Sequence, residues 1–187
     1  RNVDDEAFLR QVIRDAEARF GVDGSRVYLT GMSNGAIMAE TFAARNPDLV
    51  RAVAGVAGTM DTRSIAVAGP VPALIIHGTA DQMVPYEGGK GDQSLTRTDF
   101  ASVASVVRAF LAPWGNVTET SRKIDRKEDG TSVKVTDYTA GDQVVLRLMM
   151  VTDGAHHWPG GRKSRLEAGK TREIDANTEI LRFFALH

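Results

Sequence analysis

Residues 26–35 have the sequence RVYLTGMSNG, and this stretch decides the fold of the chain. The residues from Val27 to Thr30 are β-branched, aromatic and aliphatic, which is typical of a short buried strand. The ten residues after Gly35 carry apolar side chains at helical spacing, so they predict a helix. The small residues around Ser33 let the chain turn sharply between the two, so the serine hydroxyl stands clear of its own backbone.

A G-x-S-x-G motif between a strand and a helix is typical of the nucleophile elbow of α/β-hydrolases, and it indicates acyl transfer through a serine ester. A serine hydroxyl is a weak nucleophile near neutral pH. It needs a base, usually histidine, and an acid that fixes the tautomer of that histidine. In this fold the chain order is serine, then aspartate or glutamate, then histidine. The sequence offers Ser33, Asp81 and His156 in that order, each just beyond a predicted strand, where the catalytic groups of open α/β sheets gather.

The acid and the base both have competitors in the sequence. Asp61 and Asp153 are alternative acids to Asp81, and Asp61 is the stronger of the two because it follows the neighbouring strand. His157 is the alternative base to His156. We take Asp81 as the acid and His156 as the base.

Other residues near these positions have a structural explanation beside a functional one. His77 is expected to bond nearby backbone beneath the acid loop. Trp158 lies beside the base on a Pro-Gly loop and is expected to contact substrate, with core packing as the alternative. Met83, Val84 and Tyr86 could line the pocket wall beside the acid, but core packing is the expected role for these three residues. Histidines and aspartates could also converge on a metal, but the serine site already explains their convergence, so neither a metal nor an organic cofactor is expected.

The composition is that of a globular domain, and it argues against several classes of protein. The chain has 187 residues, 42% of them hydrophobic, which is enough for one domain with a substantial core. Its 23 lysines and arginines nearly balance 24 aspartates and glutamates, so neither a nucleic-acid nor an anionic-membrane partner is indicated. No apolar run approaches the roughly 20 residues that span a bilayer. Cysteine is absent, which excludes disulfides and thiolate chemistry.

Strand patterns alternate with helix patterns along the chain, which predicts a single α/β domain, residues 1–187, with a mostly parallel sheet and flanking helices. The last two strands are expected to form an antiparallel pair, and the first helix to be capped by Asn2. The charged stretch 122–130 is expected to be a solvated loop or hairpin tip, and 88–92 a loop. The expected strands are 27–30, 50–56, 72–76, 133–138 and 144–151, and the expected helices begin near residue 3 and at 36, 99 and 173.

Three segments of the chain, RVYLTGMSNGAIMA, VPALIIHGTADQMVPYEGG and GAHHWPGG, resemble those of the polyhydroxybutyrate-depolymerase-like esterases, a group that includes feruloyl and acetylxylan esterases. The resemblance covers nearly the whole chain. It implies Ser33 as nucleophile, Asp81 as acid and His156 as base, because the pattern H-x-W-P-G places the base at the first of the two adjacent histidines. It also implies the backbone N–H of Asn34 as one donor of the oxyanion hole.

Members of that family have further strands before the elbow strand, including one whose His-Gly loop supplies a second oxyanion donor. The resemblance therefore implies an α/β-hydrolase fold that lacks its N-terminal strands within these 187 residues. An apolar strand left at an open edge is an aggregation hazard, so we expect an N-terminal segment or a homo-oligomer partner to cover the edge of strand 27–30. Family resemblance also implies a secreted or periplasmic location.

These observations predict a serine carboxylic-ester hydrolase that works through an acyl-enzyme, acting on feruloyl- or acetyl-type esters of small or polymeric substrates. One alternative within the class is a polyhydroxyalkanoate depolymerase. An alternative from another class is a non-catalytic fragment or binding module that keeps the fold.

Overall fold

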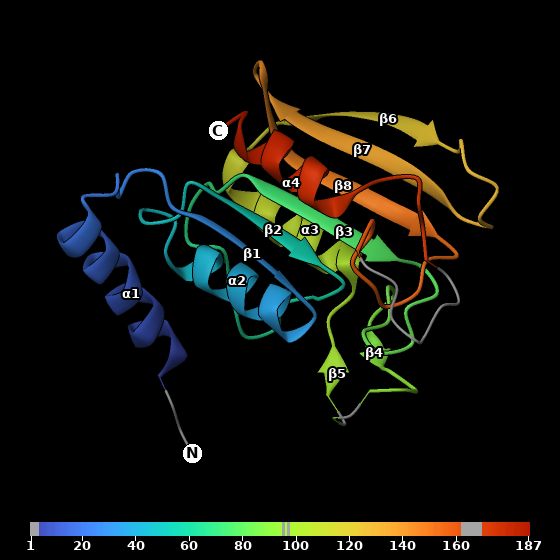
Figure 1. The fold of residues 1–187 in the computed structure, drawn as a ribbon, viewed down its shortest axis with the longest axis horizontal. Coiled ribbons are helices and arrows are strands. Elements are labelled where there is room, and N and C mark those ends of the chain that lie inside the picture. The colour runs from blue at the N-terminus through green and yellow to red at the C-terminus, as the bar shows by residue number, and fades with distance from the viewer. Residues whose placement is uncertain (1–3, 95, 97, 162–169) are drawn as a thin grey trace.

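A six-stranded sheet in the order β1-β2-β3-β8-β7-β6 forms the centre of the computed structural model, which describes residues 4–94, 96, 98–161 and 170–187 (Figure 1). The first four strands of that order run parallel, and β7 and β6 continue the sheet antiparallel. The predicted mostly parallel α/β sheet and the predicted antiparallel pair are confirmed. The strands of this sheet are β1 (Tyr28–Met32), β2 (Ala52–Val56), β3 (Ala73–Gly78), β6 (Thr118–Ile124), β7 (Ser132–Ala140) and β8 (Gln143–Thr152).

Helices cover both faces of this sheet, and each face has its own hydrophobic core. Helices α2 (Asn34–Arg45) and α3 (Val103–Leu111) pack on one face, with Phe42 and Phe110 fully buried there. Helix α4 (Ala176–Phe184) packs on the opposite face through Ile180 and Phe183, as the separation of α3 and α4 in Figure 1 shows. Strand side chains alternate between the two faces, so the middle strands β2 and β3 are buried along their whole length.

Helix α1 (Asp5–Phe20) begins and ends on local signals. Asp4 is its N-cap and accepts a hydrogen bond from the Ala7 amide at 2.9 Å. Gly21 ends it in a left-handed conformation with φ +61°, as its position predicts. The expected cap, Asn2, lies outside the described residues, and Asp4 is the cap in the structure.

Two elements were missed because their sequences carry no apolar pattern. Strand β6 has the sequence TETSRKI and is almost wholly exposed at the sheet edge, so nothing in its hydropathy indicates a strand. It takes up the first three residues of the expected loop 122–130, and the remaining residues form the hairpin tip. A two-stranded ribbon of β4 (Gly89–Lys90) and β5 (Asp99–Phe100) replaces part of the expected loop 88–92, so α3 begins later than predicted.

The β1 side of the molecule leaves apolar groups uncovered. Among the described residues, no strand pairs with the outer edge of β1. Helix α1 lies beside this end of the sheet and uses only Leu9 and Ile13 against the core (Figure 1). Phe8 is 62% exposed and Phe20 is 78% exposed, although both side chains are large and apolar. Within the described part of the chain, no helix is both long and apolar enough to cross a membrane.

Candidate active site

Ser33 occupies the tight turn between β1 and α2. Its backbone has φ +56° and ψ −122°, a conformation that side chains other than glycine rarely adopt and that costs roughly 1–3 kcal/mol. Two backbone hydrogen bonds hold it there: its N–H donates to the Val56 carbonyl at 2.9 Å, and its carbonyl accepts from the Ile37 amide at 3.0 Å. The strain is therefore sustained by β2 on one side and by the first turn of α2 on the other.

The two glycines of the motif are not equivalent in the structure. A methyl group on Gly31 would lie 2.4 Å from the carbonyl carbon and oxygen of Gly35, so the turn closes only with glycine at the first position. A methyl group on Gly35 would meet nothing within 4 Å. The sharp turn at Ser33 therefore depends on the first glycine.

Asp81 lies in the loop after β3, and its side chain is buried. One carboxylate oxygen accepts hydrogen bonds from the Met83 and Val84 amides, both at 2.9 Å. The other lies 2.8 Å from Nδ1 of His156, a residue in the loop after β8. A carboxylate that accepts two amide hydrogen bonds acts as an acceptor toward the ring as well, so Nδ1 of His156 carries the proton and Nε2 keeps its lone pair. That is the tautomer a general base requires.

Asn34 is the first residue of α2, directly after Ser33. The first amide groups of a helix have no acceptor in a preceding turn, and the helix dipole adds partial positive charge at the same end. The Asn34 N–H therefore lies where a negatively charged oxygen beside Ser33 would be stabilised.

With this geometry established, comparison with known proteins gives the family. A profile of the phospholipase/carboxylesterase family matches residues 5–104, more than half of the chain. The chain belongs to this family. The predicted esterase-type α/β-hydrolase fold is thereby confirmed.

Relatives of this phospholipase/carboxylesterase family member include proteins named as esterases. The putative esterase NocK of Nocardia uniformis subsp. tsuyamanensis is 33% identical over 175 residues, covering 84% of this chain and 49% of NocK. The probable feruloyl esterase C of Aspergillus clavatus is 32% identical over 88 residues, covering 47% of this chain and 32% of that protein. The chain thus spans about half the length of the first of these relatives and about a third of the second.

Among solved structures, the acetyl xylan esterase from Aspergillus awamori superimposes with a TM-score of 0.59 at 15% identity, over 97% of this chain and 67% of that structure. At this identity the likeness concerns the fold. Two independent comparisons, one of sequence and one of structure, thus agree that this phospholipase/carboxylesterase family member has the α/β-hydrolase architecture.

The structure distinguishes Asp81 from the two alternative acids, Asp61 and Asp153. The carboxylate of Asp61 is half-exposed and accepts hydrogen bonds from Arg63 Nε at 2.9 Å and Ser64 Oγ at 2.7 Å. The bond from Arg63 is the largest cause that lowers its pKa. Asp153 is exposed and has φ +57°. Among the residues that the structure describes, neither of these carboxylates is paired with a histidine, whereas Asp81 is.

The remaining histidines near the site are tied to backbone. His77 is buried, and its Nε2 lies 2.8 Å from the Val84 carbonyl, so this nitrogen carries the proton and donates it. The predicted structural role beneath the acid loop is confirmed. His157 Nε2 accepts from the Thr171 amide at 3.1 Å, so its Nδ1–H donates to the Ala155 carbonyl at 2.9 Å. Burial is the largest cause that lowers the pKa of both rings, so both are neutral near neutral pH.

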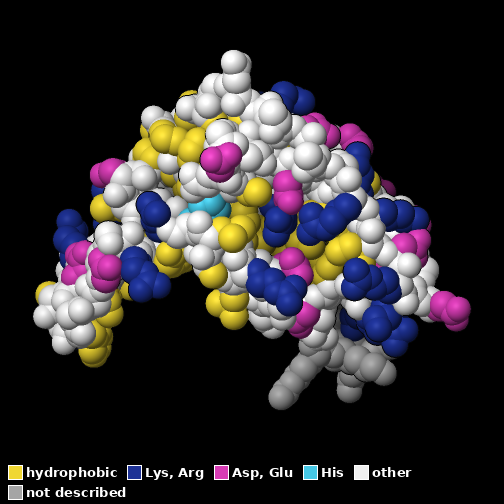
Figure 2. Space-filling view, turned by 90° about the horizontal axis from the view of Figure 1, so that it is seen from above, with side chains coloured by type: hydrophobic (Ala, Val, Ile, Leu, Met, Phe, Trp, Pro, Cys, Tyr) yellow, Lys and Arg dark blue, Asp and Glu magenta, His cyan; other side chains and the backbone are white. Residues whose placement is uncertain are grey.

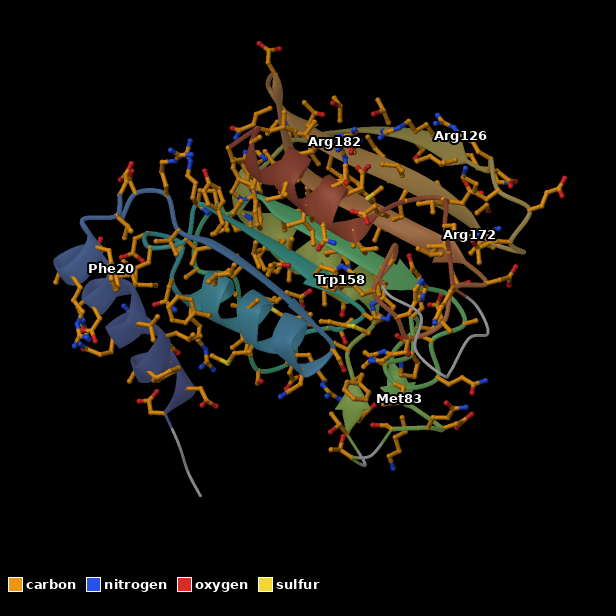
Figure 3. All side chains as sticks on the ribbon, viewed as in Figure 1. Phe20, Met83, Arg126, Trp158, Arg172 and Arg182 are labelled. Carbon is orange, nitrogen blue, oxygen red and sulfur yellow. The ribbon has the colours of Figure 1, made fainter. Side chains whose placement is uncertain are left out.

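Trp158 lies near the ends of the parallel strands, as Figure 3 shows, two residues after His156. Its half-buried ring packs against the core beneath α4. Of the residues considered with it, Val84 is buried, Tyr86 packs against the core, and Met83 is half-exposed. The structure therefore gives Trp158 a packing role and leaves part of its side chain accessible.

Two surface hollows lie away from these residues. One, of about 520 Å³, lies between β6 and α4 and is lined by Arg126 and Arg182 among other charged side chains (Figure 3). In the view of Figure 2, lysines and arginines gather with acidic groups on the right side of the molecule. Arg147, which lines the hollow, is paired with Asp137. The other, of about 400 Å³, is lined by prolines and Trp114. Ser33 lines neither hollow.

One buried acidic residue on the helix after Ser33 was not predicted from the sequence. Glu40 lies on α2 and is 1% exposed, although glutamate is among the residues least often found fully buried. A signal was present, because Glu40 shares a helix face at spacings of three and four with Ala36 and Ala43, which are both fully buried.

Proposed function

We propose that this chain carries the catalytic centre of a serine carboxylic-ester hydrolase, with Ser33 as nucleophile, His156 as base and Asp81 as the acid that orients it. The observation that carries the proposal is the 2.8 Å hydrogen bond between Asp81 and Nδ1 of His156. It leaves Nε2 able to accept a proton, and it occurs in a chain whose Ser33 sits on a strained strand-to-helix turn. Family membership supports the same reaction class.

In the first half of the proposed reaction, Ser33 Oγ attacks the ester carbonyl carbon while His156 Nε2 takes its proton. The buried Asp81 carboxylate stabilises the imidazolium that forms. The Asn34 N–H donates to the oxyanion of the tetrahedral intermediate. When the intermediate collapses, the bond to the alcohol oxygen breaks and His156 returns the proton to the leaving alcohol. The acyl group is then esterified to Ser33.

In the second half, water attacks the acyl-enzyme. His156 Nε2 takes one proton from the water as its oxygen bonds to the acyl carbon. The second tetrahedral intermediate collapses by breaking the bond to Ser33 Oγ, and His156 returns the proton to that oxygen. The products are a carboxylic acid and the free serine, so the cycle consumes one water and needs no external oxidant or reductant.

For substrate class, we propose acetyl or feruloyl esters, carried by small molecules or polysaccharides. One relative supports this choice by its name, a probable feruloyl esterase. Part of Trp158 remains accessible two residues after the base, where a flat aromatic surface could pack against a sugar or aryl group.

The test is fluorophosphonate labelling of the folded chain, followed by kinetics with p-nitrophenyl acetate, methyl ferulate and acetylated xylan. We expect labelling at Ser33, loss of labelling in Ser33→Ala, and turnover of acetyl or feruloyl esters. Clearance of polyhydroxybutyrate films without release of ferulate from methyl ferulate would favour a polyhydroxyalkanoate depolymerase instead. A folded chain that neither labels nor turns over any ester would support the non-catalytic alternative.

We also propose that another polypeptide segment covers the β1 edge, supplied by the same protein or by a second copy. The proposal rests on the unpaired outer edge of β1 and on the neighbouring exposed residues Phe8 and Phe20 of α1, of which Phe20 points away from the sheet in Figure 3. Apolar groups of this size beside an open strand edge favour association.

A further inference from the structure

Glu40 is a buried carboxyl group on the helix that follows the elbow. It lies on α2 two helical turns after Ser33 and is 1% exposed. One of its oxygens accepts a hydrogen bond from the Met60 amide at 2.9 Å. The other has no hydrogen-bond partner among the described residues. A buried polar atom without a hydrogen bond lowers the stability of the fold, so the burial of this side chain requires an explanation.

Strand β2 has a glycine, Gly55, where it lies against this carboxyl group. A methyl group on Gly55 would lie 2.2 Å from Oε1 of Glu40, so any larger residue here would displace the Glu40 carboxyl group from its present position. The segment that follows β2, residues 57–60, is buried along its whole length. The Met60 amide is thus held from inside the core by Glu40.

The same segment touches the nucleophile turn. A methyl group on Gly58 would lie 2.5 Å from the carbonyl oxygen of Ser33, so the two backbones are in direct contact. The residue before the segment, Val56, accepts the hydrogen bond from the Ser33 amide at 2.9 Å. Ala57 itself has φ +51°, a second strained position beside the strained serine. The segment is held at its start by the Ala57 N–H, which donates to the Ile76 carbonyl at 2.9 Å, and at its end by the Met60 N–H, which donates to Glu40.

We propose that Glu40 is a positioning residue for Ser33: its carboxyl group binds the Met60 amide and so holds residues 57–60 against the back of the elbow. The inference deepens the proposed function, on which its catalytic consequence rests. Glu40 touches neither substrate nor the reacting atoms, and it acts only through the segment between Val56 and Met60.

The protonation state of Glu40 fits this role. Burial raises the pKa of its carboxyl group to about 8, and the hydrogen bond from Met60 opposes the shift. The groups packed against it, Gly55 and the Met60 amide, carry no charge, and no charged side chain of the described residues contributes to the shift. Near neutral pH the group is therefore neutral, with one oxygen accepting and the other carrying the proton. Above about pH 8 it becomes an unpaired buried charge behind the nucleophile.

The experiment compares three variants with the wild-type 187-residue chain. Glu40→Gln keeps the acceptor and stays neutral at all pH values. Glu40→Leu keeps the volume and removes the acceptor. Val106→Ala, at a fully buried position of α3, is the control for a general loss of stability. Each is measured by amide hydrogen exchange at Ser33 and Met60, by fluorophosphonate labelling rate, and by kcat and KM between pH 6 and 9.

We expect faster exchange at Met60 and Ser33 in Glu40→Leu than in Val106→Ala, with kcat lowered roughly 10- to 100-fold and KM little changed. We expect wild-type kcat to fall above about pH 8 and Glu40→Gln to lose that fall. Wild-type exchange at both amides in Glu40→Leu, or a kcat no lower than that of Val106→Ala, would overturn the proposal. If the wild-type chain neither labels nor turns over an ester, the proposed function fails, and the exchange comparison still decides whether Glu40 holds the elbow.

Discussion

The backbones of Gly78 and Gly154 are in direct contact where β3 and β8 end. A methyl group on Gly78 would lie 2.1 Å from the Gly154 carbonyl oxygen, and the same oxygen accepts a hydrogen bond from the Ala80 amide at 2.9 Å. The two loops that leave this point carry Asp81 and His156. The two loops can therefore approach this closely only because Gly78 has no side chain.

Gly78→Ala is expected to separate the acid from the base. The new methyl group meets backbone atoms, which cannot rotate away, so the loops must shift apart. We expect kcat for p-nitrophenyl acetate to fall about 100-fold or more, since a displacement near 1 Å can cost that much. The control is Gly141→Ala, in the β7–β8 turn, where a methyl group meets nothing within 4 Å. Its left-handed backbone will lower stability, but kcat of the folded protein should stay near wild type.

Asp81→Asn is expected to lower kcat by roughly 10⁴-fold, because an amide no longer enforces the tautomer that leaves Nε2 of His156 free. The amide oxygen can still accept from Met83 and Val84, so the loop should stay folded, which circular dichroism would check. Asp61→Asn is the matched control, because that carboxylate is half-exposed and bonded to Arg63. A loss in Asp61→Asn as large as in Asp81→Asn would reassign the acid.

The elbow glycines should differ sharply in their tolerance of a methyl group. Gly31→Ala places it 2.4 Å from the Gly35 backbone and is expected to abolish labelling of Ser33 or to prevent folding. Gly35→Ala meets open space on the first turn of α2 and is expected to leave the fold intact, with stability unchanged or raised by about 0.5–1 kcal/mol. Thermal unfolding and the rate of Ser33 labelling measure the difference between the two variants. Similar unfolding temperatures and similar labelling rates would contradict the prediction.

Burial of His77 makes stability depend on pH in a defined direction. Burial lowers the pKa of its ring in the folded chain, so below about pH 6.5 the unfolded chain binds more protons than the folded one. Wild type should therefore lose stability relative to His77→Gln as pH falls below about 6.5, and the difference should be constant above it. Urea unfolding of both proteins at pH 5, 6 and 7 measures the effect. The glutamine can still donate a hydrogen bond to the Val84 carbonyl, which preserves that contact. Parallel pH profiles of the two proteins would contradict the prediction, because they would mean that folding leaves the pKa of His77 unchanged.

The exposed apolar face of α1 should promote association of the isolated chain. Replacing Phe8 and Phe20 with serine is expected to reduce concentration-dependent light scattering without changing the circular dichroism, because both side chains are mostly exposed. Leu181→Ser is the control, since that side chain is 67% exposed on α4, at a different face. Equal effects of the two changes would mean that association is general and does not involve the β1 side.

Much of the fold follows from local patterns in the sequence. The strand, sharp turn and helix around Ser33 are specified by residues next to one another, and so are the buried strands β2 and β3, whose apolar runs are continuous. The order of the candidate residues along the chain also follows from sequence, because the hydrolase fold requires the serine first and the histidine last. Strand β6 could not be predicted in the same way, because an exposed edge strand needs no apolar side chain.

By itself, the sequence determined the reaction class that the chain's motifs favour. It also determined which strand ends carry Ser33, Asp81 and His156. The sequence favoured Asp81 over Asp61 as the acid, but only the tertiary structure shows the contact between Asp81 and His156, because that contact depends on β3 and β8 being neighbours in the sheet. The tertiary structure alone revealed that Glu40 is buried on the helix after Ser33, because burial of a helix face depends on what the rest of the chain packs against it. Local patterns specify elements through neighbouring residues, whereas the pairing of groups far apart in sequence is fixed by strand order and by backbone contacts such as that of Gly78 with Gly154.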